Sequence, residues 1–124
     1  MTDKSNKLFI RSKIWIEDEK GKAIFGVGRL RILDAVERHG SIVAAAKELK
    51  MSYRAVWGKI KSAEQRLGGP LLTRQVGGAS GGGSELTPLA RNLIEKFRQL
   101  QVLTENTADT LFEDIFNLSS PKDP

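Results

Sequence analysis

Residues 41–67 read SIVAAAKELKMSYRAVWGKIKSAEQRL, and this stretch decides the fold. Ser41 and Ser52 each stand directly before an apolar stripe, so each is expected to cap a helix by accepting a hydrogen bond from an unpaired amide. The spacing of the apolar residues predicts one helix over 42–49 and a second over 53–67, with only a tight connection between them. Two short helices joined in this way are typical of a helix-turn-helix.

The second of these helices is expected to have two different sides. Its inward-facing side is apolar at Val56, Ile60, Ala63 and Leu67. Another face carries Tyr53, Arg54, Trp57, Gly58 and Lys61. The major groove of duplex DNA admits one helix, and the preceding helix braces it, so this polar and basic face is predicted to bind DNA. The alternative is that the two helices are simply part of a three-helix core.

Two further elements are predicted before this stretch. Apolar residues at helical spacing indicate a helix over 28–38, and Gly40 is placed to end it. Upstream, the β-prone runs at 13–16 and 23–27 flank a polar turn that contains Gly21, which favours a hairpin.

The segment after the second helix predicts a wing. Gly68-Gly69-Pro70 ends the helix, the run LLTRQV at 71–76 has strand character, and GGASGGGS at 77–84 is followed by a second short strand. Glycines at the tip of such a hairpin let main-chain amides approach phosphates without side-chain obstruction. The alternative is a flexible surface loop. No glycine-rich nucleotide-binding motif of the P-loop or dinucleotide type is present.

The residues predicted to contact DNA lie in both helices and in the wing. They are Lys47, Ser52, Tyr53, Arg54, Trp57, Lys59, Lys61, Arg74, Gly81, Gly82, Gly83 and Ser84. Arg54 is expected to reach a base edge or a phosphate, and Tyr53 to contact the DNA backbone or stack at the groove edge. Ser52 is placed to cap the helix and also to bond a phosphate, and the cap alone is the simpler reading.

The remaining side chains in this set have less specific predicted roles. Trp57 lies one turn after Tyr53, and exposure in the groove and packing against the core or the wing both stay open. Lys47 and Lys59 are expected to meet phosphates rather than bases. Arg74 is expected to point toward the minor groove or the backbone.

A long final helix is predicted after Thr87, which is expected to cap it, with Pro88 in its first turn. The residues predicted to form a dimer interface are Leu93, Phe97, Leu100, Leu103, Leu111, Phe112 and Ile115. A helix of about 28 residues spans roughly 42 Å, more than a domain of this size can bury. An antiparallel or crossed pair of helices from two copies is therefore expected. The alternative is that the first half completes the core and the second half frays.

Composition excludes several other classes. The chain has 124 residues, no cysteine and one histidine, so it lacks disulfides and thiolate metal sites. It has no apolar run long enough to span a bilayer and no secretory signal, so the cytoplasm is the expected compartment and no membrane partner is predicted. His39 has no nucleophile and acid arranged around it. No catalytic residue, metal site, cofactor or small-molecule ligand is predicted, and the chain is not expected to be an enzyme.

Charge is distributed unevenly along the chain, whose formal net charge is +5. Residues 41–76 hold seven basic and two acidic side chains, whereas residues 100–124 hold five acidic side chains and one lysine. A basic middle beside an acidic end is typical of a nucleic-acid-binding face with a separate partner region. A solvated basic surface without a ligand is the alternative.

The stretch GSIVAAAKELKMSYRAVWGKIKSAEQRLGGPLLTR resembles the winged helix-turn-helix of LysR-type regulators. MSYRAVWGKI together with GGASGGGSELT more closely resembles the DNA-binding domain of molybdate-responsive regulators of the ModE type, over roughly residues 13–105. The resemblance implies DNA binding, dimerisation and a link to molybdenum metabolism. Such regulators usually carry oxyanion-binding domains after this region. None is expected here, because the sequence ends just after the long helix, and no residue is assigned to a molybdate pocket.

The sequence thus predicts a mainly α protein with small β-hairpins, a winged helix-turn-helix with a long C-terminal dimerisation helix. The expected organisation is a flexible N-terminus at 1–12, one domain over 13–118 and a disordered tail at 119–124. The predicted function is regulation of transcription by a homodimer on double-stranded DNA. The alternative is a docking or dimerisation module that modulates another regulator.

Overall fold

A computed structural model describes residues 7–75 and 83–117. The chain divides into two compact units, one of Trp15–Phe97 and one formed by Met1–Ile14 together with Arg98–Pro124. The expectations for the N-terminus and the tail fall partly or wholly outside the described residues, and the single domain over 13–118 stays a prediction. In the described part of the chain, no helix combines the length and apolarity needed to cross a membrane.

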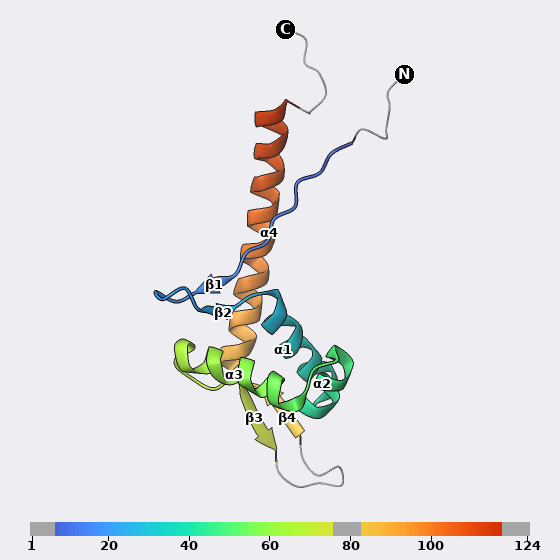
Figure 1. The fold of residues 1–124 in the computed structure, drawn as a ribbon, viewed down its shortest axis with the longest axis vertical. Coiled ribbons are helices and arrows are strands. Elements are labelled where there is room, and N and C mark those ends of the chain that lie inside the picture. The colour runs from blue at the N-terminus through green and yellow to red at the C-terminus, as the bar shows by residue number, and fades with distance from the viewer. Residues whose placement is uncertain (1–6, 76–82, 118–124) are drawn as a thin grey trace. The chain divides into compact units, whose positions relative to one another are not determined.

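The fold is mainly helical with two small antiparallel hairpins, as predicted (Figure 1). The elements are β1 Ile16–Glu17, β2 Ala23–Phe25, α1 Val27–His39, α2 Ile42–Leu49, α3 Tyr53–Leu67, β3 Leu72–Gln75, β4 Gly83–Leu86 and α4 Pro88–Phe116. The predicted bounds of α2 and α3 are confirmed, and α1 is one residue longer at each end than predicted.

Side-chain caps explain where three of the helices begin. The hydroxyl of Ser41 accepts a hydrogen bond from the amide of Ala44 at 3.1 Å, and that of Ser52 accepts one from Ala55 at 3.0 Å. Thr87 caps α4 in the same way, as predicted. Each cap satisfies a backbone donor that has no partner within its own helix.

The first hairpin is shorter than predicted. β1 begins at Ile16, which pairs with Phe25, the last residue of β2. The next residue, Gly26, is already the N-cap of α1, so no strand remains for residues 13–15 to pair with. The carboxylate of Asp18 accepts hydrogen bonds from two amides of the turn, and this sets the end of β1.

The core of the unit Trp15–Phe97 is built from the apolar faces of α1, α2 and α3 with parts of β2, β3 and α4. Its largest fully buried side chains are Phe25, Phe97, Ile32, Leu33, Ile60, Leu71, Val36 and Val56. The rings of Phe25 and Phe97 pack edge to face, with centroids 5.1 Å apart. The inward-facing stripe predicted for α3 is confirmed at Val56, Ile60 and Ala63, whereas Leu67 is only half-buried.

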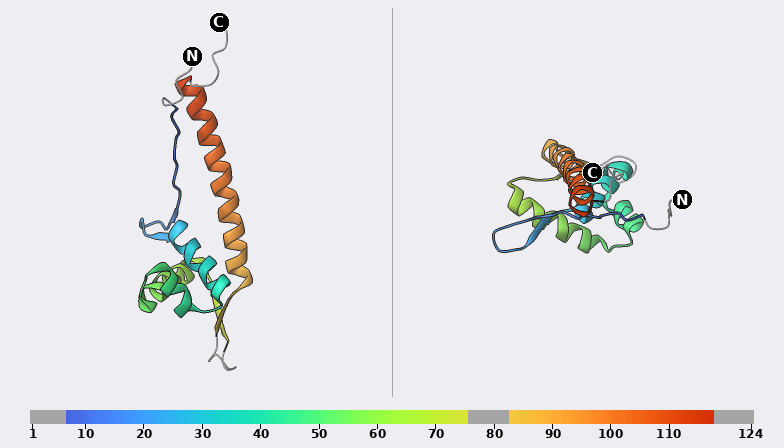
Figure 2. Two further views of the ribbon diagram at one scale, coloured as in Figure 1. Left: turned by 90° about the vertical axis from the view of Figure 1, so that its right-hand side faces the viewer. Right: turned by 90° about the horizontal axis from the view of Figure 1, so that it is seen from above.

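Helix α4 begins in this core. Ala90, Ile94 and Phe97 are buried, so its first part completes the core, which was the alternative that the sequence left open. The prediction that Phe97 lies at a dimer interface is wrong, because its side chain is 2% exposed and already covered by its own chain. The helix then continues without a break to Phe116 (Figure 2).

The wing is anchored at its base. β3 and β4 pair antiparallel from Leu72 with Leu86 to Gln75 with Gly83. The amide of Ser84 donates to the carbonyl oxygen of Gly40 at 2.9 Å, and a Cβ atom on Gly83 would lie 2.6 Å from the same oxygen. Position 83 is therefore a glycine because the turn between α1 and α2 approaches it closely.

The way the wing is anchored contradicts part of the prediction that residues 81–84 contact phosphates. The prediction that the Ser84 amide donates to a phosphate is wrong, since that amide is used by Gly40 and the residue is buried. The glycine at 83 is likewise explained by the contact with Gly40. Gly81 and Gly82 lie outside the described residues.

One ion-pair cluster joins the end of α1 to α2. Both oxygens of the Glu48 carboxylate accept from the Arg38 guanidinium, at 2.7 and 2.9 Å, and His39 Nε2 lies 2.6 Å from one of them. The hydrogen bonds from Arg38, and then from His39, lower the pKa of Glu48 to about 2 from an ordinary 4.5. A carboxyl group whose pKa is lowered on folding stabilises the fold above its unfolded pKa, and this is lost as pH falls through the folded pKa.

We therefore expect Glu48→Gln to lower the midpoint of thermal unfolding by a few degrees at pH 7. The difference from the unchanged protein should shrink below pH 4.5 and vanish only below about pH 2, where the Glu48 carboxylate of the folded protein is itself protonated. Calorimetry across this pH range measures the effect. Glu85→Gln is the matched control, because the Glu85 side chain is exposed in β4 with no side-chain partner among the described residues. A difference that stays constant with pH would contradict the expectation.

Candidate nucleic-acid interface

Helix α3 presents a polar face beside its buried one. Val56, Ile60 and Ala63 hold it against the core. Tyr53 at its first position is 44% exposed, and Arg54 one residue later is also exposed. The start of α3, which is the part that a recognition helix turns toward base edges, is therefore open to a partner.

Four side chains from α3 and β3 form one cluster on this face, which we call the Tyr53 cluster: Tyr53, Trp57, Lys61 and Arg74. The indole Nε1 of Trp57 donates to the Tyr53 hydroxyl at 2.7 Å, and Nη2 of Arg74 donates to the same oxygen at 2.8 Å. The Arg74 guanidinium carbon lies 5.0 Å from the centre of the Trp57 ring, and Lys61 Nζ lies 5.5 Å from it. Cations at such distances are attracted by the face of an indole ring.

The Tyr53 cluster links the recognition helix to the wing. Arg74 comes from β3, 21 residues after Tyr53, and a side chain of α3 holds its guanidinium in place. Trp57 is half-buried and packs beneath Arg74, so it contacts the wing and still borders the exposed face. Of the two positions that the sequence left open for Trp57, the structure shows packing against the wing, and exposure in the groove stays a prediction.

Three other residues predicted to contact DNA are not members of this cluster. Ser52 is exposed and caps α3, and Lys47 is exposed on α2. Lys59 does not share the face of Arg54 and Lys61, because at 3.6 residues per turn it lies about 140° to 160° around the helix from them. Its carbonyl accepts a hydrogen bond from Nε of Arg29 on α1, at 2.9 Å.

The pairing inside the Tyr53 cluster is what reasoning from the sequence missed. The i, i+4 spacing of Tyr53 and Trp57 was a local signal for contact between them. The role of Arg74 had no such signal, since its bond to Tyr53 depends on how β3 returns along α3. No group of three or more side chains able to ligate a metal occurs within residues 7–75 and 83–117.

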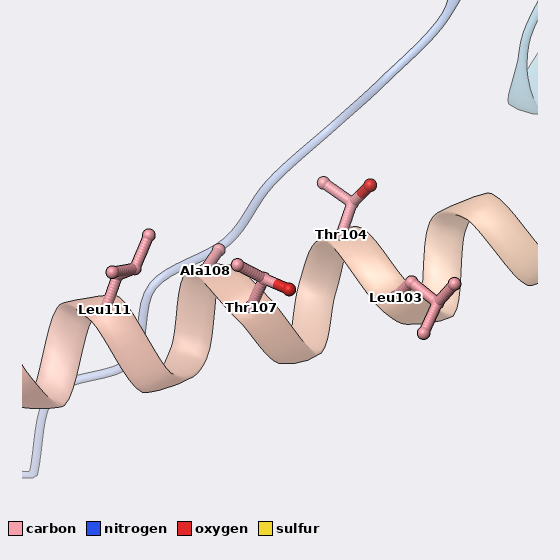
Figure 3. A pocket seen from close by; sticks show the side chains of 5 residues that line it. All are labelled: Leu103, Thr104, Thr107, Ala108 and Leu111. Carbon is pink, nitrogen blue, oxygen red and sulfur yellow. The ribbon is translucent and has the colours of Figure 1, made fainter.

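A second surface lies on the part of α4 that belongs to the other unit. A shallow apolar hollow there is lined by Leu103, Thr104, Thr107, Ala108 and Leu111 (Figure 3). All five side chains come from one helix, so small residues sit between two leucines. A hollow bounded by a single helix is open on its other side and does not enclose a small molecule.

A helix-turn-helix with an exposed basic second helix, followed by an anchored β-hairpin, defines a winged helix-turn-helix domain. Comparison with known proteins then places the chain more closely. Residues 27–91 match the family described as bacterial regulatory helix-turn-helix protein, lysR family, and the chain belongs to that family.

Several curated proteins are similar over the same region. The molybdenum transport protein ModE of Azotobacter vinelandii is 39% identical over 85 residues, which is 68% of this chain and 32% of that protein. The transcriptional regulator ModE of Haemophilus influenzae is 37% identical over 95 residues, covering 77% of this chain and 36% of that protein. The chain thus spans about a third of the length of these relatives.

A solved structure agrees with this assignment. The complex of the CbnR DNA-binding domain with DNA superposes with a TM-score of 0.54 and 28% identity, covering 69% of this chain and 93% of that one. The expectation of a LysR-like, ModE-like regulatory domain is therefore confirmed at the level of family and fold. The DNA contacts of individual residues stay predictions.

Proposed function

We propose that this chain is the DNA-binding part of a transcription regulator and reads duplex DNA as a homodimer, with α3 in the major groove and the wing beside it. The observation that carries the proposal is the Tyr53 cluster, because it joins the exposed face of α3 to β3 as one basic surface. Arg54 lies one residue after Tyr53, where recognition helices contact base edges.

The proposed dimer rests on the exposed apolar side chains of α4. Leu100, Leu103, Leu111 and Ile115 are between 48% and 73% exposed within a single chain. The hollow between Leu103 and Leu111 has small side chains, so a second helix can approach closely there. Leu93 and Phe112 are half-buried and would border this interface rather than form its centre. Two-fold symmetry of the protein implies a palindromic site on the DNA.

The wider role follows from the relatives. Because proteins similar to this chain are named for molybdenum transport and for transcriptional regulation, we propose control of molybdenum-linked genes. A regulator of this kind acts where the genome lies, so the cytoplasm stays the expected compartment. The Haemophilus influenzae relative is named as a transcriptional regulator, and a non-enzymatic role is proposed on that ground.

The proposal is tested by selecting duplexes from a randomised pool with the purified protein and titrating the selected duplex by fluorescence anisotropy. We expect enrichment of a palindromic motif, and a loss of affinity in Arg54→Ala of about 5- to 160-fold for each subunit, if Arg54 makes one bidentate contact per subunit worth about 1–3 kcal/mol. Lys96→Ala is the matched control, because Lys96 is exposed on α4 away from the Tyr53 cluster. Absence of binding at low salt would overturn the proposal and favour a protein-docking module instead.

A further inference from the structure

The hydroxyl of Tyr53 has both of its accepting positions filled. A phenol oxygen has two lone pairs and one hydrogen. Indole and guanidinium nitrogens donate only, so the bonds from Trp57 at 2.7 Å and from Arg74 at 2.8 Å must both be accepted by this oxygen. What remains to the hydroxyl is its own hydrogen.

That hydrogen has no acceptor among residues 7–75 and 83–117, and the Tyr53 side chain is 44% exposed. Donation from a cationic guanidinium to the oxygen also polarises the O–H bond, which strengthens any hydrogen bond that it donates in turn. The Tyr53 hydroxyl is therefore left with one role at the start of α3, as a hydrogen-bond donor whose accepting positions are both filled.

We propose that Tyr53 is a DNA-contacting residue whose hydroxyl donates to a hydrogen-bond acceptor of the duplex, and that Trp57 and Arg74 act as positioning residues that prevent the hydroxyl from accepting. The acceptor is a phosphate oxygen or an acceptor atom on a base edge, because both offer the same chemistry. This inference rests on the proposed DNA binding, and it specifies for one of the contacts that the protein donates the hydrogen bond and the duplex accepts it.

The same arrangement makes the three side chains a functional unit. With Trp57→Phe the indole donor is lost and one lone pair of the Tyr53 oxygen is freed, so the hydroxyl is able to rotate and to accept. We therefore expect Trp57→Phe to lose no more affinity for the duplex than Tyr53→Phe loses. The double variant should bind no more weakly than Tyr53→Phe alone. Trp15→Phe is the matched control, since it removes an indole bond to Glu17 outside the cluster.

The test measures binding of the full chain to a duplex selected from the random pool with the unchanged protein. Tyr53→Phe should bind about tenfold more weakly for each subunit, and so about 100-fold more weakly as a dimer, because each subunit loses one hydrogen bond to a charged or strongly polar acceptor. Two sets of modified duplexes locate the acceptor. Neutral methylphosphonates replace each phosphate in turn, and base analogues lacking a single acceptor atom, such as 7-deazaguanine, replace each base.

Either set supports the proposal if a modification at one position of the duplex weakens binding of the unchanged protein but leaves binding of Tyr53→Phe unaffected. A phosphate position identifies a backbone contact, and a base position identifies direct reading of sequence. Equal affinity of Tyr53→Phe and the unchanged protein would overturn the proposal while leaving DNA binding intact. So would a loss that accompanies a lower unfolding midpoint and is the same on every modified duplex. Failure of the unchanged protein to bind any duplex would remove the proposed function itself.

Discussion

Between 50 and 200 mM salt, the affinity of this protein for its selected duplex should fall by about 10³- to 10⁵-fold, if a dimer contacts about 6–10 phosphates. The physical reason is the release of counterions from DNA when protein cations replace them. Apart from Lys59, which lies on another face of α3, the exposed cations predicted to contact DNA in a single chain are Lys47, Arg54, Lys61 and Arg74. Two-fold symmetry doubles this number, which brings the dimer into that range.

The measurement is an anisotropy titration at several salt concentrations, plotted as the logarithm of affinity against the logarithm of salt concentration. Lys61→Ala should reduce the magnitude of the slope by about 2 for a dimer, because each phosphate contact contributes about 0.9. Lys96→Ala removes an exposed charge on α4, outside the Tyr53 cluster, and should leave the slope unchanged. A nearly flat salt response in the unchanged protein would contradict binding through this face.

Phe97→Ala should lower the free energy of unfolding by about 3–5 kcal/mol, as expected for removing a buried aromatic ring. The Phe97 side chain is 2% exposed and packs edge to face on Phe25, so truncation leaves a cavity between α4 and β2. Chemical denaturation monitored by circular dichroism at several protein concentrations measures this loss. The size of the effect should not depend on protein concentration, because the contact lies within one chain.

Leu103→Ala is the informative comparison, since Leu103 belongs to the same helix but is 56% exposed. If the exposed side of α4 binds a second copy, this change should weaken self-association, and its effect on stability should shrink as the protein is diluted and the unchanged dimer itself dissociates. Sedimentation equilibrium distinguishes the two variants. A Phe97→Ala protein with unchanged stability and lost self-association would show that the assignment of Phe97 to the core is wrong.

The local elements of the fold could be predicted well from residue patterns. Ser41, Ser52 and Thr87 cap helices because a short side chain and the next turn of backbone are all that a cap requires. The inward faces of α1 and α3 follow from the 3.6-residue repeat of apolar positions. A helix-turn-helix was therefore visible in 27 consecutive residues, from Ser41 to Leu67.

The same periodicity could not separate the roles of residues within one stripe. Phe97 and Leu100 continue a single apolar pattern on α4, yet the first is buried in the core and the second is 48% exposed. A repeat shows which side of a helix is apolar, but what covers that side depends on elements distant in the chain. The error at Ser84 has the same origin, because its amide bonds to Gly40, 44 residues earlier.

By itself, then, the sequence determined the class of fold, the start of each major helix and the basic face of α3, because these depend on interactions within a few residues. Only the tertiary structure decided that Phe97 belongs to the core, that the base of the wing is anchored on the turn after α1, and that Arg74 reaches back to Tyr53. Each of these contacts joins residues at least 21 positions apart, and no local pattern specifies which distant groups the folded chain brings within bonding distance.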